Sequence, residues 1–251
     1  MKVTRNFIGV IVLLALFAIS AYSEDDDDHP RWRYKHGFFR GGAGGFEVMY
    51  LNLDLPALNQ KLAEVGLPSI DDHMILTGGG GWAFLGKGIR IGGYGFGGSV
   101  SKDGKPYHVQ KEVTLSMGLG GLLVEKVFHP FNNTELYLGL SSGGGGIDIK
   151  MVQWTGPRSW DELWSEFGID TLGTEHTNLD YEVKLSRSFG YLMPTIGFRY
   201  NIFRWFAVGF NVNYIYCWKL NSWKHEGKKV TGVPEIDFSN VSYRINFYFG
   251  G

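Results

Sequence analysis

The chain has 251 residues and a formal net charge of −1, from 24 basic and 25 acidic side chains. This balance gives no electrostatic basis for binding nucleic acid, and a single cysteine, Cys217, excludes an intramolecular disulfide. The 37 glycines are about twice the usual share, and aromatic residues make up 16% of the chain. Length and composition together favour one large all-β domain.

The first 23 residues have the pattern of a cleaved export signal. Lys2 and Arg5 precede an apolar run over residues 7–19, and small residues follow it at 21–23. This run is shorter than the ~20 apolar residues that a spanning helix needs, so cleavage is favoured over an uncleaved signal anchor. The acidic residues that follow predict a flexible segment over residues 24–37.

Alternation with a period of two, bounded by Gly, Pro, Asn and Asp, predicts eight strands between residues 38 and 251. We expect an antiparallel up-and-down β-barrel with short helices in two long loops. In the third strand, the alternation predicts a bulge or bend at Gly92-Gly93. The eight predicted ranges are 38–54, 73–85, 88–99, 107–125, 134–153, 184–201, 204–219 and 238–250.

The predicted connections alternate between long and short. Long ones follow the first, third, fifth and seventh strands, and tighter ones lie at 86–87, 126–133 and 202–203. Outer-membrane barrels have this parity, with long loops outside the cell and both chain termini on the periplasmic side. The parity therefore predicts an outer-membrane location.

The two faces of each strand differ in composition. One face is apolar and uncharged, as in Val113, Leu115, Met117 and Leu119 of the fourth strand, and we expect it to face lipid. Over the fourth, sixth, seventh and eighth strands, the other face is mostly Gly, Ser, Thr, Asn and Ala, which suits a narrow lumen. A soluble barrel carrying an apolar ligand, with the faces reversed, remains the alternative.

Four charged residues are expected to share the lumen: Glu47, Arg90, Arg199 and Arg244. Buried charges must be paired. A network that locks the barrel is favoured over an ion gate, because charged residues are common filling in narrow barrels.

The export signal, the eight amphipathic strands and the last strand resemble the small outer-membrane β-barrel proteins. In that group, the last strand ends in an aromatic residue that the barrel-assembly machinery reads. The resemblance implies such a signal in Tyr243, Ile245, Phe247 and Phe249, although Gly250 and Gly251 follow here. It also implies outer-membrane lipid and the assembly machinery as partners.

The longest loop carries a predicted short helix that begins near Ser159 and ends at Gly168. Its apolar stripe consists of Trp160, Leu163, Trp164 and Phe167. The stripe is expected to pack onto the barrel mouth or the helix-like segment 56–65. A docking patch for lipid or an apolar ligand is the sharper alternative.

Candidate catalytic groups are sparse. Asp71-Asp72-His73 offers a general base with Ser186 or Ser159 as nucleophile, but a solvated loop explains these residues better. No metal or cofactor motif is present. We therefore expect a non-enzymatic outer-membrane barrel with an envelope or surface-binding role and an unidentified surface ligand. A lipid-modifying or proteolytic barrel enzyme is the alternative.

Overall fold

The computed structural model describes residues 41–106, 109–154, 156, 159–161 and 181–250. The expected signal peptide and acidic segment lie outside the described residues. Eight strands form the body of the molecule: β1 (Gly42–Asn52), β2 (His73–Gly86), β3 (Ile89–Gly104), β4 (Gln110–Phe131), β5 (Thr134–Trp154), β6 (Tyr181–Phe203), β7 (Phe206–Tyr214) and β11 (Val241–Gly250).

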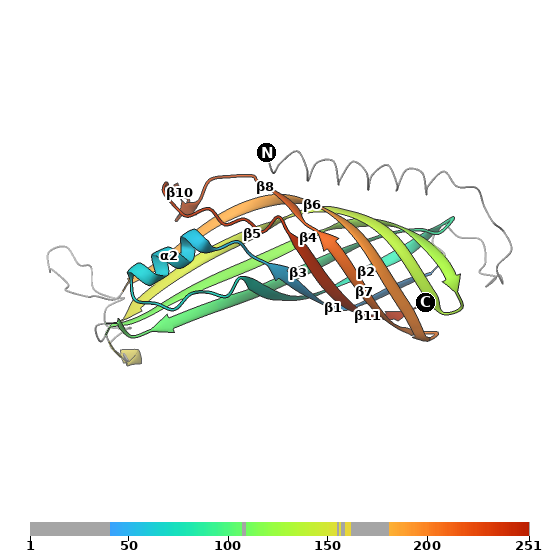
Figure 1. Cartoon of the computed structure of the whole chain (residues 1–251), viewed down its shortest axis with the longest axis horizontal. Helices are drawn as coiled ribbons and strands as arrows, with labels where there is room; N and C mark the ends of the chain where they lie inside the picture. Colours follow the sequence, from blue (N-terminus) through green and yellow to red (C-terminus); the bar gives the residue numbers. More distant parts are fainter. Residues whose placement is uncertain (1–40, 107–108, 155, 157–158, 162–180, 251) are drawn as a thin grey trace.

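These eight strands close into a ring, as Figure 1 shows. Each pairs in antiparallel fashion with its neighbours, and β11 closes the ring between β7 and β1. In the closing pair, Phe46 lies opposite Phe247 and Glu47 opposite Asn246. The predicted up-and-down β-barrel of eight strands is confirmed. Within the ring, closure pairs every strand on both sides; beyond it β3 has a free edge, because its pairing with β2 ends at Gly97 while its pairing with β4 continues to Gly104.

Smaller elements in the described parts of the connections include helix α2 (Pro56–Glu64), β8 (Tyr216–Lys219), β9 (Lys224–His225) and β10 (Lys228–Lys229). We call the end of the barrel with α2 and β10 the loop end, at the left of Figure 1. The opposite end, with the chain's C-terminus, is the turn end. Among the described residues, no helix is long and apolar enough to span a membrane.

The turn end is built from short connections, and one of them was predicted wrongly. Residues 126–131, expected in a loop, belong to β4, and only residues 132–133 make the turn to β5. The pairing of β4 with β5 shifts between Phe128 and Phe131. This irregularity accommodates Pro130, which has no N–H to donate to a regular ladder. Asn133, with φ of 62°, completes the turn.

The strand lengths divide the barrel into a ring and a wall. β1, β7 and β11 have 11, 9 and 10 residues, whereas β4, β5 and β6 have 22, 21 and 23. The longer strands extend well past the shorter ones toward the loop end in Figure 1. We call this extension, formed by β3–β6, the wall.

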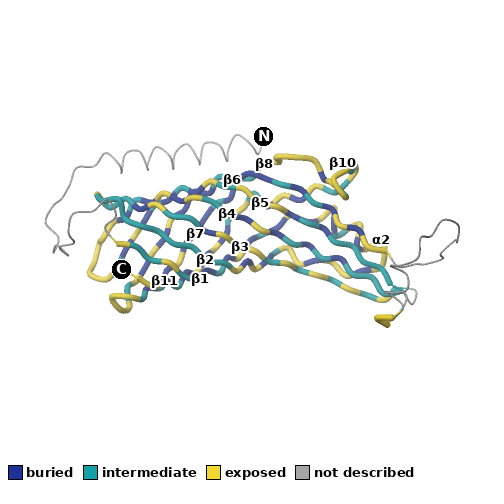
Figure 2. Tube along the Cα trace, turned by 180° about the vertical axis from the view of Figure 1, so that it is seen from behind, coloured by how far each residue is buried: buried dark blue, intermediate teal, exposed yellow. Residues whose placement is uncertain are grey.

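The faces of β6, β7 and β11 are arranged as predicted, and Figure 2 shows buried and more exposed positions alternating along the strands. Ile196, Phe210 and Ile245 face outward, each with 45–54% of its surface exposed. Thr195, Asn211 and Arg244 face the interior, with 1% exposed. In these strands the large apolar side chains therefore lie on the outside.

In β4 the prediction was wrong. Val113, Leu115, Met117 and Leu119 face the interior, with at most 7% of their surface exposed. At this height the strand belongs to the wall, where apolar side chains pack under α2 and its flanking segments. Nearer the turn end the same strand turns Leu122 outward, with 74% exposed.

The predicted bulge at Gly92-Gly93 was also wrong. β3 pairs with β2 in continuous register from Gly97 to Arg90, and the only shift lies between Phe84 and Gly86 of β2. Because the alternation is unbroken, Arg90, Tyr94 and Phe96 all face the interior. An inward Gly92 is required there, since a Cβ would lie 2.1 Å from the carbonyl oxygen of Gly81.

The loop-end half of the interior is an apolar core. Leu58 and Leu62 of α2 are buried against the inner face of the wall, together with Leu67 and Ile70 of the following segment. The Asn59 side chain fixes this segment by accepting from Ile70 N at 2.8 Å and donating to Ile70 O at 3.0 Å. The wall thus has a covered apolar inner face.

Candidate functional site

Toward the turn end, the interior changes from apolar to charged. Three arginines and three glutamates lie there, each with at most 6% of its surface exposed: Arg90, Arg199, Arg244, Glu47, Glu125 and Glu135. They come from β1, β3, β4, β5, β6 and β11, so the ring brings together residues far apart in sequence. Their charges balance, which is the condition for burying so many ions.

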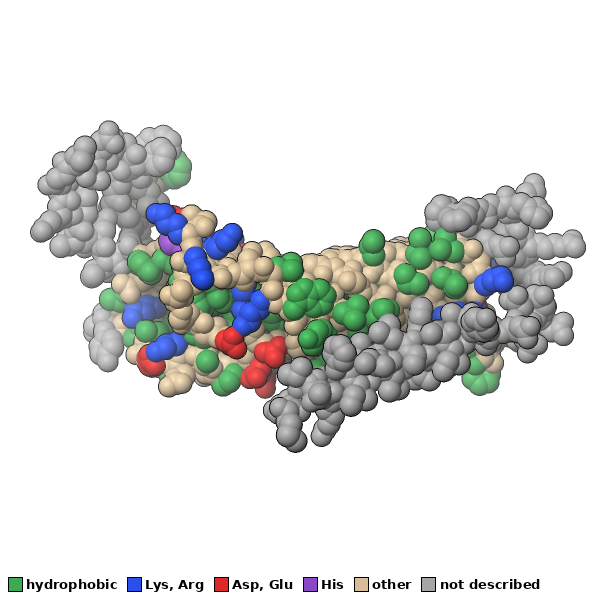
Figure 3. Space-filling model, turned by 90° about the horizontal axis from the view of Figure 1, so that it is seen from above, with side chains coloured by type: hydrophobic (Ala, Val, Ile, Leu, Met, Phe, Trp, Pro, Cys, Tyr) green, Lys and Arg blue, Asp and Glu red, His purple; other side chains and the backbone are tan. Residues whose placement is uncertain are grey.

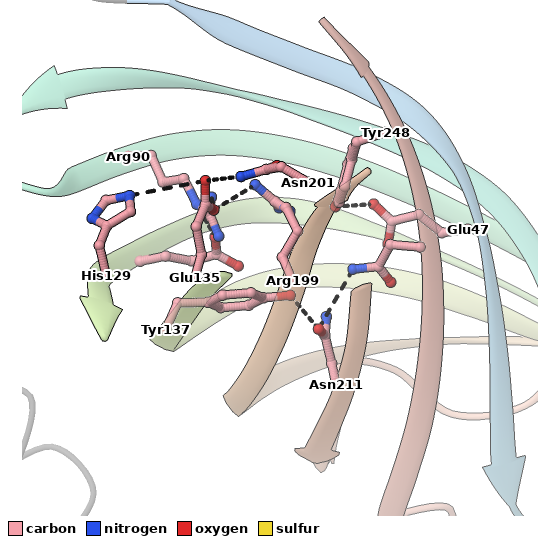
Figure 4. A network of polar contacts seen from close by, with 11 residues as sticks. Glu47, Arg90, His129, Glu135, Tyr137, Arg199, Asn201, Asn211 and Tyr248 are labelled. Carbon is pink, nitrogen blue, oxygen red and sulfur yellow. Dashed lines mark hydrogen bonds and ion pairs between the residues drawn. The ribbon is translucent and has the colours of Figure 1, made fainter. Parts of the chain in front are cut away.

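Arg90 is the centre of the first group of contacts (Figure 4). Its Nε donates to Glu125 Oε2 at 2.6 Å, and its Nη1 donates to Glu135 Oε2 at 2.7 Å. Arg199 Nη1 donates to the same Glu135 oxygen at 3.1 Å. Two carboxylates and two guanidinium groups therefore form one continuous ionic network across four strands.

The other oxygen of Glu135 points toward the turn end. It accepts from Asn201 Nδ2 at 3.4 Å and lies 4.0 Å from His129 Nε2. The His129 side chain is 53% exposed, whereas Glu135 is 8% exposed. His129 thus marks the place where the buried network approaches solvent.

A second group of contacts surrounds Glu47. Tyr248 donates its hydroxyl to Glu47 Oε1 at 2.6 Å, and Arg244 Nη1 lies 3.3 Å from Glu47 Oε2. Asn211 connects this group to the first by contacting the Tyr137 hydroxyl. With its amide oxygen turned toward Arg244, Asn211 accepts from Nε at 2.9 Å and from Nη2 at 2.7 Å.

Aromatic rings separate the arginines. The guanidinium of Arg90 lies 4.6 Å from the ring centres of both Trp82 and Tyr137. Arg199 lies 4.7 Å from the ring of Trp82 and 4.4 Å from that of Tyr248. Cation–π contacts of this kind gain strength when they are desolvated. Rings and guanidinium groups together occupy the lumen at this level.

All four residues of the expected lumen network are placed inside the barrel: Glu47, Arg90, Arg199 and Arg244. Sequence reasoning missed two acidic partners, Glu125 and Glu135, and the ring that lies between the arginines, Trp82. Glu125 could have been found by parity, since it shares a face with Leu119 and Leu123, but the strand was expected to end there. Glu135 lies at the second position of β5, next to the turn.

The proposed helix in the longest loop falls mostly outside the described residues. Of its stripe, only Trp160 is described, and 71% of its surface is exposed. Leu163, Trp164 and Phe167 lie outside the described residues. The four residues of the expected assembly signal all lie on the outward face of β11, where Tyr243, Ile245 and Phe249 are 42–51% exposed and Phe247 is partly buried.

The residues considered for catalysis are not brought together. His73 stacks on Tyr50, with ring centres 5.2 Å apart, and its Nδ1 lies 3.6 Å from Asp72 Oδ1. Ser186 lies on β6, which is four strands away from β2 in either direction around the ring. Ser159 follows the end of β5. Within the described ranges, no group of three His, Cys, Asp or Glu side chains could hold a metal ion.

No protein-family model and no curated protein sequence matches this chain. Solved structures with a similar fold include Ail of Yersinia pestis in complex with a heparin analogue, at 9% identity and a TM-score of 0.41, covering 84% of this chain and 99% of that one. OprG of Pseudomonas aeruginosa has 14% identity, a TM-score of 0.44 and coverage of 84% and 94%. The protease OmpT of Escherichia coli has 8% identity, a TM-score of 0.35 and coverage of 84% and 95%. The resemblance to outer-membrane barrels is one of architecture alone.

Proposed function

We propose that this protein is an integral outer-membrane β-barrel with a closed, charge-paired interior. Its role is non-enzymatic: it anchors the wall and the loop-end segments at the membrane surface, for an envelope or surface-binding function. The observation that carries this proposal is a closed ring with large apolar side chains outside and paired charges inside. A soluble barrel would place these two kinds of side chain the other way round.

Strand length supports the membrane location. A tilted transmembrane strand needs about 9–11 residues, and β1, β7 and β11 have 11, 9 and 10. Outward side chains along them are apolar and exposed, including Phe46 at 49%, Phe210 at 45% and Ile245 at 45%. In water such a belt is an aggregation hazard, whereas in hydrocarbon it is the required surface.

Aromatic rings at the ends of this belt also fit a bilayer. At the turn end, Trp205 stacks against Phe203 and Phe249, at ring distances of 5.7 and 6.2 Å. Toward the loop end, Tyr50 and Tyr243 lie 6.4 Å apart on neighbouring strands. Tyr and Trp prefer the interface between hydrocarbon and headgroups. We assign the two sets to the two membrane surfaces.

The wall lies beyond this membrane layer. Its outer face carries ion pairs across neighbouring strands, with Lys150 Nζ 2.9 Å from Glu182 Oε1 and Lys184 Nζ 3.0 Å from Asp148 Oδ2. These side chains are 34–61% exposed. Charged pairs of this kind belong in water, so the wall is the part of the molecule available to a partner outside the cell.

The closed interior argues against a channel. The ionic network fills the lumen near the turn end, and the apolar core with α2 fills it near the loop end. We propose that the network of Glu47, Arg90, Arg199 and Arg244, with Glu125 and Glu135, locks the ring rather than gating ions. A buried network stabilises the ring only when its charges are paired, and each carboxylate of this set contacts an arginine.

An enzymatic role is less well supported. The His73 ring stacks on Tyr50, and the nucleophile considered for it on β6 lies on the other side of the ring. Partners of the chain are, in this proposal, membrane lipid and the machinery that inserts barrels. That machinery would read the outward side chains of β11, ending in Phe249. The exposed Trp160 loop remains our candidate for contact with a surface ligand.

Two measurements on the purified full chain test this proposal. The folded barrel should migrate faster than the boiled chain in a detergent gel, and reconstitution into a planar bilayer should give no ion conductance. Steady single-channel currents would contradict the closed interior. A chain that remains soluble without detergent and shows no heat-dependent shift would contradict the membrane barrel itself.

A further inference from the structure

Above the apolar belt, one edge of β6 carries an ordered series of side chains. Trp218 lies opposite Gly190, the N–H of Leu220 donates to Ser188 O at 3.2 Å, and Lys224 lies opposite Ser186. Because side chains alternate between faces, these positions share the outward face of β6. Trp218 is 42% exposed and Leu220 is 60% exposed. Toward the loop end, the outward side chains along this edge thus change from apolar, at Trp218 and Leu220, to basic, at Lys224.

The spacing of this series matches a membrane surface. Gly190 lies four positions after Ser186 on β6, which is about 13 Å along the strand at ~3.3 Å per residue. With a tilt of ~40°, the difference in height is about 10 Å. The headgroup layer on each side of the hydrocarbon is about 5–8 Å thick, and a flexible lysine side chain can reach back over the remaining few ångströms. With Trp218 at the edge of the hydrocarbon, the backbone of Lys224 lies at the outer limit of the headgroups, and its ammonium group reaches their phosphates.

Two lysines meet at this level. β9 and β10 form a hairpin in which Lys229 lies directly opposite Lys224, on the same face of the ladder. Both side chains are exposed, and no ion pair reaches either of them within the part of the chain that the structure describes. Like charges directly opposite one another on a hairpin are destabilising. An anion between them would remove the repulsion.

Other basic groups near the hairpin are already neutralised. Lys184 is paired with Asp148 at 3.0 Å, and Lys219 donates to Glu235, a hydrogen bond that lowers the pKa of the Glu235 carboxyl. Lys228, beside Lys229, adds a third exposed charge. Figure 3 shows basic side chains and a histidine gathered near one end of this face, beside hydrophobic side chains along the barrel.

The hairpin is held in a fixed position. Its turn has positive φ at Glu226 and Gly227, 48° and 79°, which are the backbone angles of a tight two-residue connection. His225 Nδ1 lies 3.0 Å from Lys184 O. Just before the hairpin, Trp223 is 6% exposed and its ring lies 4.8 Å from the guanidinium of Arg187. These contacts hold the hairpin, and with it the backbone of Lys224 and Lys229, in one position on the barrel.

We propose that Lys224 and Lys229, together with Trp218, form a binding site for the phosphate group of an anionic lipid headgroup. The two ammonium groups hold the phosphate, and Trp218 and Leu220 contact the apolar part of the lipid below it. This site rests on the proposed membrane location. It fixes the height and rotation of the barrel in the outer leaflet through a specific contact.

The test uses the full chain, folded in detergent, with phosphatidic acid as the probe and phosphatidylcholine as the neutral reference. Native mass spectrometry counts bound lipid as its concentration is raised. Lys224→Gln with Lys229→Gln should weaken phosphatidic acid binding by at least about tenfold, since each lysine near a charged lipid surface contributes roughly fivefold. Lys61→Gln with Lys102→Gln removes the same charge elsewhere at the loop end and should leave binding unchanged.

Two further measurements distinguish a lipid site from a simple anion site. Trp218→Ala should weaken phosphatidic acid binding, and millimolar inorganic phosphate should not displace the lipid. Displacement by inorganic phosphate would overturn the lipid assignment and leave a simple anion site. Equal binding by the wild type and the double lysine variant would overturn the site itself. In every arm a heat-dependent gel shift reports the folded barrel, so loss of that shift in the wild type would contradict the membrane proposal instead.

Discussion

Arg90 Nη1 lies 2.7 Å from Glu135 Oε2. The two residues are on β3 and β5, which are the two neighbours of β4 in the sheet, so the ion pair spans β4 on the inner face of the barrel. The arginine side chain has none of its surface exposed, and the glutamate 8%. Each of the two ions also has a second partner, Glu125 for Arg90 and Arg199 for Glu135, so both are stable in this place only because they belong to a charge-paired network. Removing one of these charges therefore measures how much the ionic network contributes to the stability of the barrel.

Replacing Arg90 with alanine should lower the free energy of unfolding by about 3–5 kcal/mol, because Glu125 would lose its arginine partner and Glu135 one of its two, while both stay buried. Urea titration of the detergent-folded barrel, followed by the gel shift, measures this. Lys61→Ala is the control, since its pair with Glu64 is 62% and 50% exposed and is worth about 0–1 kcal/mol. Equal losses in the two variants would mean that the network does not lock the ring.

Two neighbouring glycines of β5 give a matched pair. A Cβ on Gly145 would lie 2.3 Å from the carbonyl oxygen of Gly118 and 2.5 Å from the Phe189 ring, whereas a Cβ on Gly146 would meet nothing closer than 4.0 Å. Gly145→Ala should cost about 1–3 kcal/mol through overpacking, and Gly146→Ala much less. The same urea titration compares them. A more damaging Gly146→Ala would contradict the assignment of inner and outer faces.

The strand number and the parity of the connections could be predicted from sequence, because period two and turn residues are local signals. The direction of the faces could not be predicted along the whole of β4. Leu115 faces a core under α2, while Leu122 in the same strand faces outward. Alternation shows which side chains share a face of the strand. Which face points inward depends on what the strand packs against at that height of the barrel.

The candidate site shows the same limit. Inward positions for Glu47, Arg90, Arg199 and Arg244 followed from alternation. Their partners did not, because they depend on register between strands: Arg90 lies directly opposite Glu125 of β4, and Arg199 directly opposite Glu135 of β5. The contact of Trp82 on β2 with Arg199 on β6 crosses the lumen and depends on closure as well. Neither register nor closure is encoded in a single strand.

Topology predicts where protease can reach the chain on intact cells. Lys224, Lys228 and Lys229 are exposed in the loop-end hairpin, so added trypsin should cut there. The turn at Lys87-Gly88 should be protected, because it lies on the periplasmic side in this account. Mass spectrometry of the released fragments identifies the site. Cleavage restricted to the turn would reverse the orientation.

The last strand predicts an assembly phenotype. Phe247 pairs with Phe46 of β1 and with Val208 of β7, so deletion of residues 247–251 leaves both neighbours partly unpaired. Unpaired backbone is not tolerated in lipid. The truncated chain should therefore be absent from the outer-membrane fraction, whereas a chain lacking only Gly251 should accumulate normally. Normal insertion of the shorter chain would refute the terminal signal.

The central claim is that the outward apolar belt lies in hydrocarbon. Val212 is 41% exposed on the outward face of β7, and Lys229 is exposed at the loop end. In a Cys217→Ser background, a fluorophore is attached at Val212→Cys or at Lys229→Cys, and the barrel is reconstituted in lipids brominated near the middle of their chains. We predict strong quenching at position 212 and little at position 229. Quenching of the position 212 probe by aqueous iodide, with no response to brominated chains, would contradict the account.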